Sequence, residues 1–509
     1  MTGLSSPLPE NSGTATQPPT RRPAPDRRQP WFSSLLRRLH FYAGILVGPF
    51  ILIAALSGAV YAISPQIERV VYADELTAST EGPALPLSDQ VESANAYIGE
   101  GQTIATVRPA PEPGMTTRVM YEDPTLDSSD YRTIFVDPTT AEVKGDLPVY
   151  AASSTLPVRT WISRLHTDLH LGDVGRYYSE LAASWMGIIA AAGLCLWIVR
   201  ARKAKKISSM LKPSRKHKGL RRTLSWHAST GVWIAVGMLF LSATGITWSQ
   251  LGGGNVGALR EALNWTTPSV STELSEDPGT EADAGGAHAG HGAASGGTEA
   301  APAGTPNPAD FDMISSMAEN AGFTTSYIEI VPPADADTAW LVERYQHNYP
   351  DNTGTVSVAY DMATMAETDR VEFSDYGVAA MLTSVAIDLH MGTLFGLPNQ
   401  IVLFVLALGI ASMVVWGYTM WWQRRPKHDT SRRFGIAPAR GALKQAPWWG
   451  VALVVLAAVG IGLFLPLVGL SLVAFLVLDV ILGLLARRKV RAQSGAGKEM
   501  APASRSWPE

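Results

Sequence analysis

Four of the ten histidines in this sequence are related in pairs by internal repeats. His390 follows His166 by 224 positions, and the same offset relates Gly172 to Gly396, Gly193 to Gly417 and Asp137 to Asp361. A second offset, of 187 positions, relates His40 to His227, Gly44 to Gly231, Ser57 to Thr244 and Gly58 to Gly245. Neutral imidazoles are common metal ligands, and two of them on opposite faces of an iron form a bis-histidine haem. The repeats therefore predict paired histidines that bind haem.

The four histidines fall into two pairs by their expected depth in a membrane. His40 and His227, here the first pair, open apolar helices that are predicted to enter from the cytoplasm. His166 and His390, here the second pair, precede apolar helices that are predicted to enter from outside. A single membrane histidine can be an interfacial anchor, but four at related positions favour a functional site. The sequence thus predicts one or two haem b groups.

The second pair has an alternative member. His170 follows His166 by four residues, so a continuous helix would place both on one face, where such a pair can bind a metal directly. Position 394, the repeat equivalent of His170, is leucine, which favours His166 as the ligand.

Glycines near the first pair fit a flat macrocycle. Gly44 and Gly48 follow His40 at one-turn intervals, and Gly231 follows His227 in the same way. Close packing between membrane helices explains such glycines equally well. Four arginines at the same level are available to haem propionates but are also expected at a cytoplasmic surface: Arg37, Arg38, Arg221 and Arg222.

The apolar stretches predict a mainly helical membrane protein. About 20 apolar residues cross roughly 30 Å of hydrocarbon. Four such stretches occupy residues 41–63, 178–199, 226–248 and 399–422, and two more, at 448–468 and 470–486, predict a helical hairpin. We therefore expect six transmembrane helices.

Basic residues predict the orientation. The 200–222 loop carries eleven Lys or Arg and the 423–446 loop carries seven, and cytoplasmic loops retain such residues. Both termini are therefore expected in the cytoplasm, with residues 64–177 and 249–398 outside a bacterial cell membrane. No cleavable signal peptide precedes Trp31, so the first helix is the expected export signal. The net charge of −4 reflects this topology and does not indicate nucleic-acid binding.

The outside segments predict two similar small α+β modules. The first has a helix at Leu87–Ile98, strands at Thr103–Arg108, Thr117–Tyr121 and Tyr131–Val136, a turn at 137–140 and an extended run at Ala141–Lys144. The second has a helix at Phe311–Asn320, strands at Ser326–Val331, Ala339–Tyr345 and Thr355–Tyr360, and a turn at 361–364. The only cysteine, Cys195, lies in a predicted membrane helix, so no disulfide staples these modules.

Domain boundaries follow from these segments. We expect a disordered arm (1–30), a first membrane helix (31–63), a first module (64–165), a second membrane helix (166–199), a basic loop (200–225), a third membrane helix (226–248), a second module (249–389), a fourth membrane helix (390–422), a basic loop (423–447), the helical hairpin (448–486) and a tail (487–509).

The remaining polar residues give weaker indications. Residues 268–306 are rich in Gly, Ala, Ser and Thr and are predicted to be a disordered insert. Its His288 and His291 are interpreted as linker residues, with weak metal binding as the alternative. Asp479, in the predicted hairpin, either pairs locally or serves a proton or quinone site. The other histidines without repeat partners are interpreted as surface residues: His217, His347 and His428.

Four motifs in order resemble the PepSY-associated transmembrane family, which includes membrane reductases of siderophore iron uptake. They are Arg-Leu-His-Phe-Tyr-Ala-Gly at 38–44, Leu-His-Thr-Asp-Leu-His-Leu-Gly at 165–172, Trp-His-Ala-Ser-Thr-Gly at 226–231 and Leu-His-Met-Gly-Thr-Leu-Phe-Gly-Leu-Pro at 389–398. The resemblance covers about residues 31–425. It implies two PepSY-like modules on a helical core and, for the reductase members, haem bound by these histidines.

The predicted function is transmembrane electron transfer. Electrons from a quinol or a reductase would pass through haem to ferric iron or a ferric siderophore outside, because siderophore oxygen ligands hold Fe(III) far better than Fe(II). No flavin or dinucleotide motif is visible, so the donor is a separate partner. Two alternatives have no bound haem: a membrane protein whose modules bind peptide or regulate a protease, and a metal-handling membrane protein.

Overall fold

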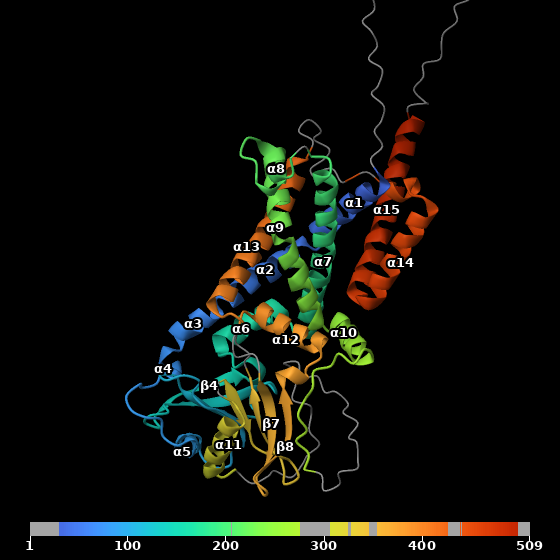
Figure 1. Ribbon diagram of the computed structural model, residues 1–509. Coiled ribbons are helices and arrows are strands. Elements are labelled where there is room, and N and C mark those ends of the chain that lie inside the picture. Colours follow the sequence, from blue (N-terminus) through green and yellow to red (C-terminus); the bar gives the residue numbers. More distant parts are fainter. Residues whose placement is uncertain are drawn as a thin grey trace, which may run out of the picture.

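The structure is a computed structural model that describes residues 30–204, 206–274, 306–323, 327–345, 354–425, 438 and 440–496. It has a helical bundle joined to an eight-stranded antiparallel sheet (Figure 1). The predicted arm, the disordered insert with its two histidines, His347 and His428 lie wholly or mostly outside the described residues.

Four long helical segments form the bundle. They are α1 (Trp31–Leu46) with α2 (Gly48–Ala62), α7 (Asp173–Ala201), α9 (Gly219–Thr247) and α13 (Leu397–Gln423). The segment α1–α2 contacts both α7 and α13, and α9 contacts these same two helices, so the bundle is closed around a common interior. Its apolar core includes Val47, Trp185, Met238 and Ile410. This arrangement brings helices from the two halves of the sequence together.

The first membrane helix is bent rather than continuous. An angle of 62° separates α1 from α2 at Val47, where one straight helix was predicted. Pro49 causes the bend, because proline has no N–H to donate to the carbonyl of Ile45 and its ring clashes with that turn. The Tyr418 hydroxyl donates to this carbonyl at 2.5 Å. The carbonyl that the bend leaves without a helical partner is thus hydrogen-bonded by a residue of α13.

The number of membrane spans differs from the prediction. In the described part of the chain, four helices are long and apolar enough to cross a membrane, or five if α1 and α2 form one bent span. The hairpin consists of α14 (Trp448–Phe464) and α15 (Pro466–Ala496). With 17 residues, α14 is about 25 Å long, shorter than the hydrocarbon core. The chain is a multi-pass membrane protein with four or five candidate spans where six were predicted.

The hairpin docks on the bundle through polar contacts. Asp479 forms ion pairs with Arg38 of α1 at 2.5 Å and with Arg440 at 3.1 Å. The Trp185 indole N–H donates to Ser471 at 2.8 Å. Asp479 therefore pairs with α1 and with the segment before α14, and it engages one of the arginines that were expected to be available to haem propionates.

Two short helices lie between the bundle and the sheet (Figure 1). They are α6 (Pro157–Thr167) and α12 (Val378–Met391), and neither was predicted as a separate helix. Each is followed by a turn in which a repeat-related glycine has positive φ: 57° at Gly172 and 56° at Gly396. Glycine adopts this conformation readily because it has no Cβ. These turns separate the histidine-bearing helices from the spans that follow.

The sheet combines strands from both outside segments. Its order is β4-β3-β2-β1-β5-β6-β7-β8, and the two segments join where Val107 of β1 pairs with Ile330 of β5. The strands are β1 (Ile104–Arg108), β2 (Thr117–Tyr121), β3 (Asp130–Val136), β4 (Val143–Tyr150), β5 (Ile328–Val331), β6 (Trp340–Arg344), β7 (Thr355–Asp361) and β8 (Ala366–Glu372). Helices α5 (Leu87–Ile98) and α11 (Pro308–Asn320) share one apolar core with it.

Most predicted strands occur, with two differences. The extended run after the first turn is longer than predicted, and the edge strand β8 was missed because its sequence, AETDRVE, has almost no apolar residues. The described residues also form shorter elements: α3 (Ser64–Val71), α4 (Ala73–Leu76), α8 (Ser208–Leu211), α10 (Leu251–Ala262) and the 3-10 turns at Ala151–Ser153, Phe373–Asp375 and Ala442–Gln445.

A pair of facing carboxylates predicts a pH-dependent stability. Glu343 of β6 lies opposite Glu329 of β5, and Glu329 pairs with Arg108 at 2.7 Å. Burial and the Glu329 carboxylate raise the pKa of Glu343 from its ordinary value of 4.5 to about 8. The folded state thus binds a proton that the unfolded state releases, so stability is lost as pH rises from 4.5 to about 8.

We expect Glu343→Gln to reduce this loss, since the amide cannot ionise. The loss is measured as the drop in the melting temperature of the detergent-purified protein between pH 5 and pH 9. Glu92→Gln, on the exposed face of α5, is the control and should unfold like the wild type. An equal drop in melting temperature for wild type and Glu343→Gln contradicts the assignment.

Candidate functional site

The first pair meets inside the bundle. His40 of α1 and His227 of α9 have ring centroids 6.1 Å apart, with the ring planes at 81°. A metal–imidazole bond is about 2 Å long, so two imidazoles on opposite sides of one metal have centroids about 6 Å apart. The two histidines, which are 187 positions apart in sequence, therefore have the separation of a shared metal centre.

The ring of His40 is held by α7. Its Nδ1 lies 3.0 Å from the carbonyl oxygen of Ile189. A carbonyl only accepts hydrogen bonds, so Nδ1 carries the proton and Nε2 keeps its lone pair. Gly193 lets the ring approach closely, because a Cβ on this glycine would lie 3.0 Å from Cε1 of His40. Close approach between this histidine and a neighbouring helix therefore depends on the missing side chain of Gly193.

A buried donor near this pair lacks a hydrogen-bond partner among the described residues: Nε1 of Trp197, which lies one turn after Gly193 on the same face of α7. The His227 ring faces the backbone of Met413, which the 224-position offset relates to Ile189. Buried polar atoms are rarely left unpaired without a reason such as an additional bound group. A Cβ on Gly44 or on Gly417 would meet no atom within 4 Å, so there is open space beside both glycines. These observations fit a haem at the first pair.

The second pair is built by repeat-related contacts. Nδ1 of His166 lies 3.1 Å from the hydroxyl of Ser57, and Nδ1 of His390 lies 2.5 Å from the hydroxyl of Thr244. Ser57 and Thr244 are themselves related by the 187-position offset. Each hydroxyl sits on the neighbouring membrane helix of its own half, α2 or α9. The two halves therefore position their histidines in the same way.

These hydroxyls determine which ring nitrogen carries the proton. Ser57 donates to the Ile53 carbonyl at 2.8 Å, and Thr244 donates to the Phe240 carbonyl at 2.9 Å. With their protons engaged, the hydroxyl oxygens accept from Nδ1–H of the histidines. Nε2 is then unprotonated, as an iron ligand requires, and the Nδ1 contact is the usual outer-shell support of a metal-binding histidine.

A glycine of α2 and an indole ring pack against the histidines of the second pair. A Cβ on Gly58 would lie 3.0 Å from Cε1 of His166, so α2 approaches this ring through Gly58. Trp248 packs against His390 with centroids 5.1 Å apart. His166 and His390 are close enough to interact electrostatically. The donor set fits haem iron at this pair also.

His170 is not on the helical face of His166. Helix α6 ends at Thr167, and His170 has a φ of 56° in the turn that follows. Its exposed ring packs on Trp161 with centroids 4.9 Å apart. The expectation of an i, i+4 histidine pair was wrong because it assumed a continuous helix.

Other predicted residues have different neighbours. Gly48 begins α2 beyond the bend and packs on Tyr418, so it does not share the face of His40. A Cβ on Gly231 would lie 2.7 Å from the end of Met413, and Gly245 packs on Ala183. Gly231 and Gly245 therefore serve helix packing, the alternative explanation of the glycines. His217 is exposed, as expected, and no group of three or more metal-ligating side chains occurs within the described ranges.

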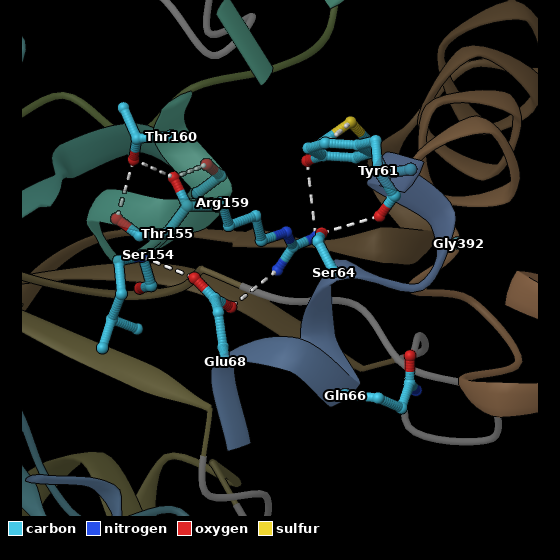
Figure 2. Close-up of polar contacts among 12 residues, drawn as sticks. Tyr61, Ser64, Gln66, Glu68, Ser154, Thr155, Arg159, Thr160 and Gly392 are labelled. Carbon is cyan, nitrogen blue, oxygen red and sulfur yellow. Dashed lines mark hydrogen bonds and ion pairs between the residues drawn. The ribbon is translucent and has the colours of Figure 1, made fainter. Parts of the chain in front are cut away.

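A polar network below the second pair was missed by the sequence reasoning. Figure 2 shows Arg159 of α6 reaching between Tyr61 and Glu68. Its guanidinium lies 3.4 Å from the Tyr61 hydroxyl and 3.8 Å from the Glu68 carboxylate. Tyr61 in turn contacts Met391, the residue after His390, at 3.9 Å. The network thus links α2 with both histidine-bearing short helices.

The same network contains a buried carboxylate. Burial raises the pKa of Glu68, which the nearby Arg159 guanidinium opposes. The carboxylate also accepts the backbone N–H of Leu156 at 2.8 Å. Arg159 lies seven residues before His166, on the same side of α6 and about 10 Å along its axis. This network fixes the position of α6 relative to the first span.

We expect the double variant Ser57→Ala, Thr244→Val to weaken haem binding at the second pair. Loss of such outer-shell contacts typically lowers metal affinity about 10- to 100-fold. Haem retained per chain after purification measures the effect. The matched control is Ser412→Ala, whose hydroxyl donates only within α13, to Leu408 at 2.8 Å. Equal haem retention in both variants contradicts the role of the two hydroxyls.

Comparison with known proteins agrees with this architecture. No curated protein matches the chain. The family model described as the PepSY-associated TM region matches residues 37–424, which is more than half of the chain and includes all four paired histidines. The hairpin α14–α15 lies beyond the matched region. The resemblance drawn from the four sequence motifs is confirmed, and the chain belongs to the PepSY-associated TM region family.

Proposed function

We propose that this protein is a haem-containing transmembrane electron-transfer protein that reduces ferric iron or ferric siderophores at its outer face. The observation that carries the proposal is the matching support of His166 and His390 by Ser57 and Thr244, which leaves both Nε2 atoms free to bind a metal. The 6.1 Å separation of His40 and His227 supports a second centre. One or two haem b groups, held without covalent attachment, fit a chain with a single cysteine.

The proposed topology has both termini in the cytoplasm of a bacterial cell. The basic loop 200–222 joins the ends of α7 and α9 that lie away from the sheet (Figure 1). By the positive-inside rule this end is cytoplasmic and the sheet is outside. The first pair then lies near the inner surface and the second pair near the outer surface. The sheet is interpreted as two PepSY-like modules that arose by duplication.

Each group of residues has a role in this proposal. Haem supplies reversible one-electron chemistry at both pairs when bound. The Ile189 carbonyl, Ser57 and Thr244 hold the protons of three histidines on Nδ1 and so orient their rings. The apolar bundle excludes water between the pairs. A quinol or a separate reductase is the proposed donor, because the described cytoplasmic segments are too short to fold a nucleotide-binding domain.

Purified protein in liposomes tests this function. A quinol is added as the donor, and a ferric chelate is supplied together with a chromogenic ferrous-specific chelator. We expect ferrous iron to form well above the rate of protein-free liposomes, and a His227→Ala, His390→Ala double variant to show only that background. Haem-loaded protein with background activity contradicts a ferric reductase. Protein without haem favours a non-redox peptide-binding or regulatory role.

A further inference from the structure

We propose that Asp479 of the hairpin α14–α15 lowers the reduction potential of a haem at the first pair by neutralising Arg38. This inference deepens the proposed function and rests on it. Asp479 is a positioning residue, since it acts on the first pair through Arg38, its partner at 2.5 Å. The hairpin lies beyond residues 37–424, which match the family model, so this control comes from outside the shared region.

One face of α15 docks the hairpin on the bundle, beside α7 and α1 (Figure 1). Val468, Leu472 and Phe475 pack in the core of the bundle with Trp185, and they follow one another at intervals of three or four residues. Asp479 follows Phe475 by four residues, so the helical spacing places it on the same face. A carboxylate therefore occupies the stripe through which α15 packs its apolar side chains.

This carboxylate lies between two positive charges. Asp479 is the only charged residue in the apolar span Pro466–Leu485, and a carboxylate within hydrocarbon needs a partner of opposite charge. Its Oδ1 lies 2.5 Å from the Arg38 guanidinium and 3.1 Å from that of Arg440. Gly483, one turn further along α15, lets Arg440 lie against the helix, because a Cβ there would lie 2.6 Å from its guanidinium.

Stability alone does not require the ion pair of Asp479 with Arg38. Apolar residues of similar volume often replace a buried ion pair without loss of stability. The preceding turns of α15 already pack on the bundle through apolar side chains. A charge at this position has an electrostatic effect on its surroundings that an apolar residue lacks.

Arg38 joins the hairpin to the first pair. It precedes His40 by two residues, about 3 Å along the axis of α1. Its side chain is only 14% exposed, and the guanidinium lies 5.3 Å from the centroid of the Tyr42 ring. A spacing of two residues places Arg38 across α1 from His40, and the helix is about 10–12 Å in diameter. At such a distance, with little solvent between, a charge acts on the first pair with weak screening.

Neutralisation of Arg38 favours electron flow toward the second pair. A nearby positive charge stabilises ferrous over ferric haem, because the ferrous form carries one positive charge less, and so raises the reduction potential. Asp479 offsets the charge of Arg38 and keeps this potential low. Forward transfer moves one electron from the first pair to the second, so that the first iron is oxidised and the second reduced, with no proton moved. The hairpin thus makes the first pair the better electron donor.

Spectroelectrochemical titration of the detergent-purified holoprotein tests this assignment. All samples carry His390→Ala, so that the titrated haem is that of the first pair. We expect Asp479→Asn to raise the ratio of ferrous to ferric haem at a fixed potential about three- to tenfold, a shift of about +30 to +60 mV. Arg38→Gln should shift the potential in the opposite direction. The double variant Asp479→Asn, Arg38→Gln loses both charges and should return close to the starting value.

Further variants separate charge from packing. Asp479→Glu keeps the charge and should keep the potential. Asp146→Asn breaks an ion pair of the sheet, with Arg132 at 2.6 Å, and should leave the potential unchanged. Arg440→Gln leaves the pair of Asp479 with Arg38 in place and should lower the potential, which keeps the test available if Asp479→Asn does not accumulate. Other basic residues near this end are present in every variant, so their charges cancel in the comparison: Arg37, Arg221 and Arg222.

The outcomes distinguish this inference from the proposed function. Equal potentials with and without Asp479→Asn, or an unchanged potential in Arg440→Gln, overturn the inference, while bound haem leaves the proposed function intact. A double variant shifted further than either single variant also overturns it, because damage to packing accumulates whereas opposite charges cancel. Protein without haem rejects the proposed function and this inference together.

Discussion

Replacement of His227 by alanine is expected to remove the haem of the first pair and leave about half of the wild-type haem per chain. His40 alone supplies one axial ligand, and the remaining metal bond does not offset the cost of holding the macrocycle in the bundle. The pyridine haemochrome assay on purified protein, normalised to protein concentration, measures this change. Membrane levels of the variant should be close to wild type, because alanine is a strong helix former and His227 lies within the long helix α9.

His217→Ala is the matched control for this experiment. His217 is exposed in the basic loop, ten residues before His227, and should retain the full haem content. Wild-type haem content in His227→Ala contradicts the assignment of the first pair. Loss of all haem would mean that the two centres do not form independently.

The second large effect is expected from His390→Ala. Without His390 the second pair loses one iron ligand, so ferric reduction at the outer face should fall to background while quinol still reduces the haem of the first pair. Stopped-flow absorbance of haem reduction, together with ferrous iron formation in liposomes, separates these two steps. The loss should not come from unfolding, since His390 has one side-chain hydrogen bond, with Thr244, and one ring contact, with Trp248, in the described structure.

His170→Ala distinguishes the two candidate ligands of the second pair. Because His170 lies in the exposed turn after α6, its removal should leave the haem content unchanged. Loss of haem in His170→Ala with retention in His166→Ala would reverse the assignment.

The sequence predicted which histidines form pairs better than it predicted the local geometry around them. The repeat offsets identified His40 with His227 and His166 with His390, because duplicated positions report a shared role whatever lies between them. The 187-position offset also relates Ser57 to Thr244, but the sequence indicates no role for these two hydroxyls. Their hydrogen bonds depend on how α6 lies against α2 and α12 against α9, and helix packing of this kind is set by tertiary contacts.

The errors came from treating helices as continuous. Hydropathy does not show that Pro49 bends the first span or that the turns at Gly172 and Gly396 place the second pair on separate short helices. The predicted face shared by His40 and Gly48, and that shared by His166 and His170, failed for this reason. Strands with alternating apolar residues were predicted well. The polar edge strand β8 was missed because it buries little surface.

The most direct test is the absorption spectrum of the detergent-purified protein, oxidised and then reduced with dithionite, with haem quantified per chain. Two histidine pairs predict a low-spin b-type spectrum and close to two haems per chain. A colourless protein purified from haem-replete cells would contradict the account, and the four histidines would then be packing groups of a non-redox membrane protein.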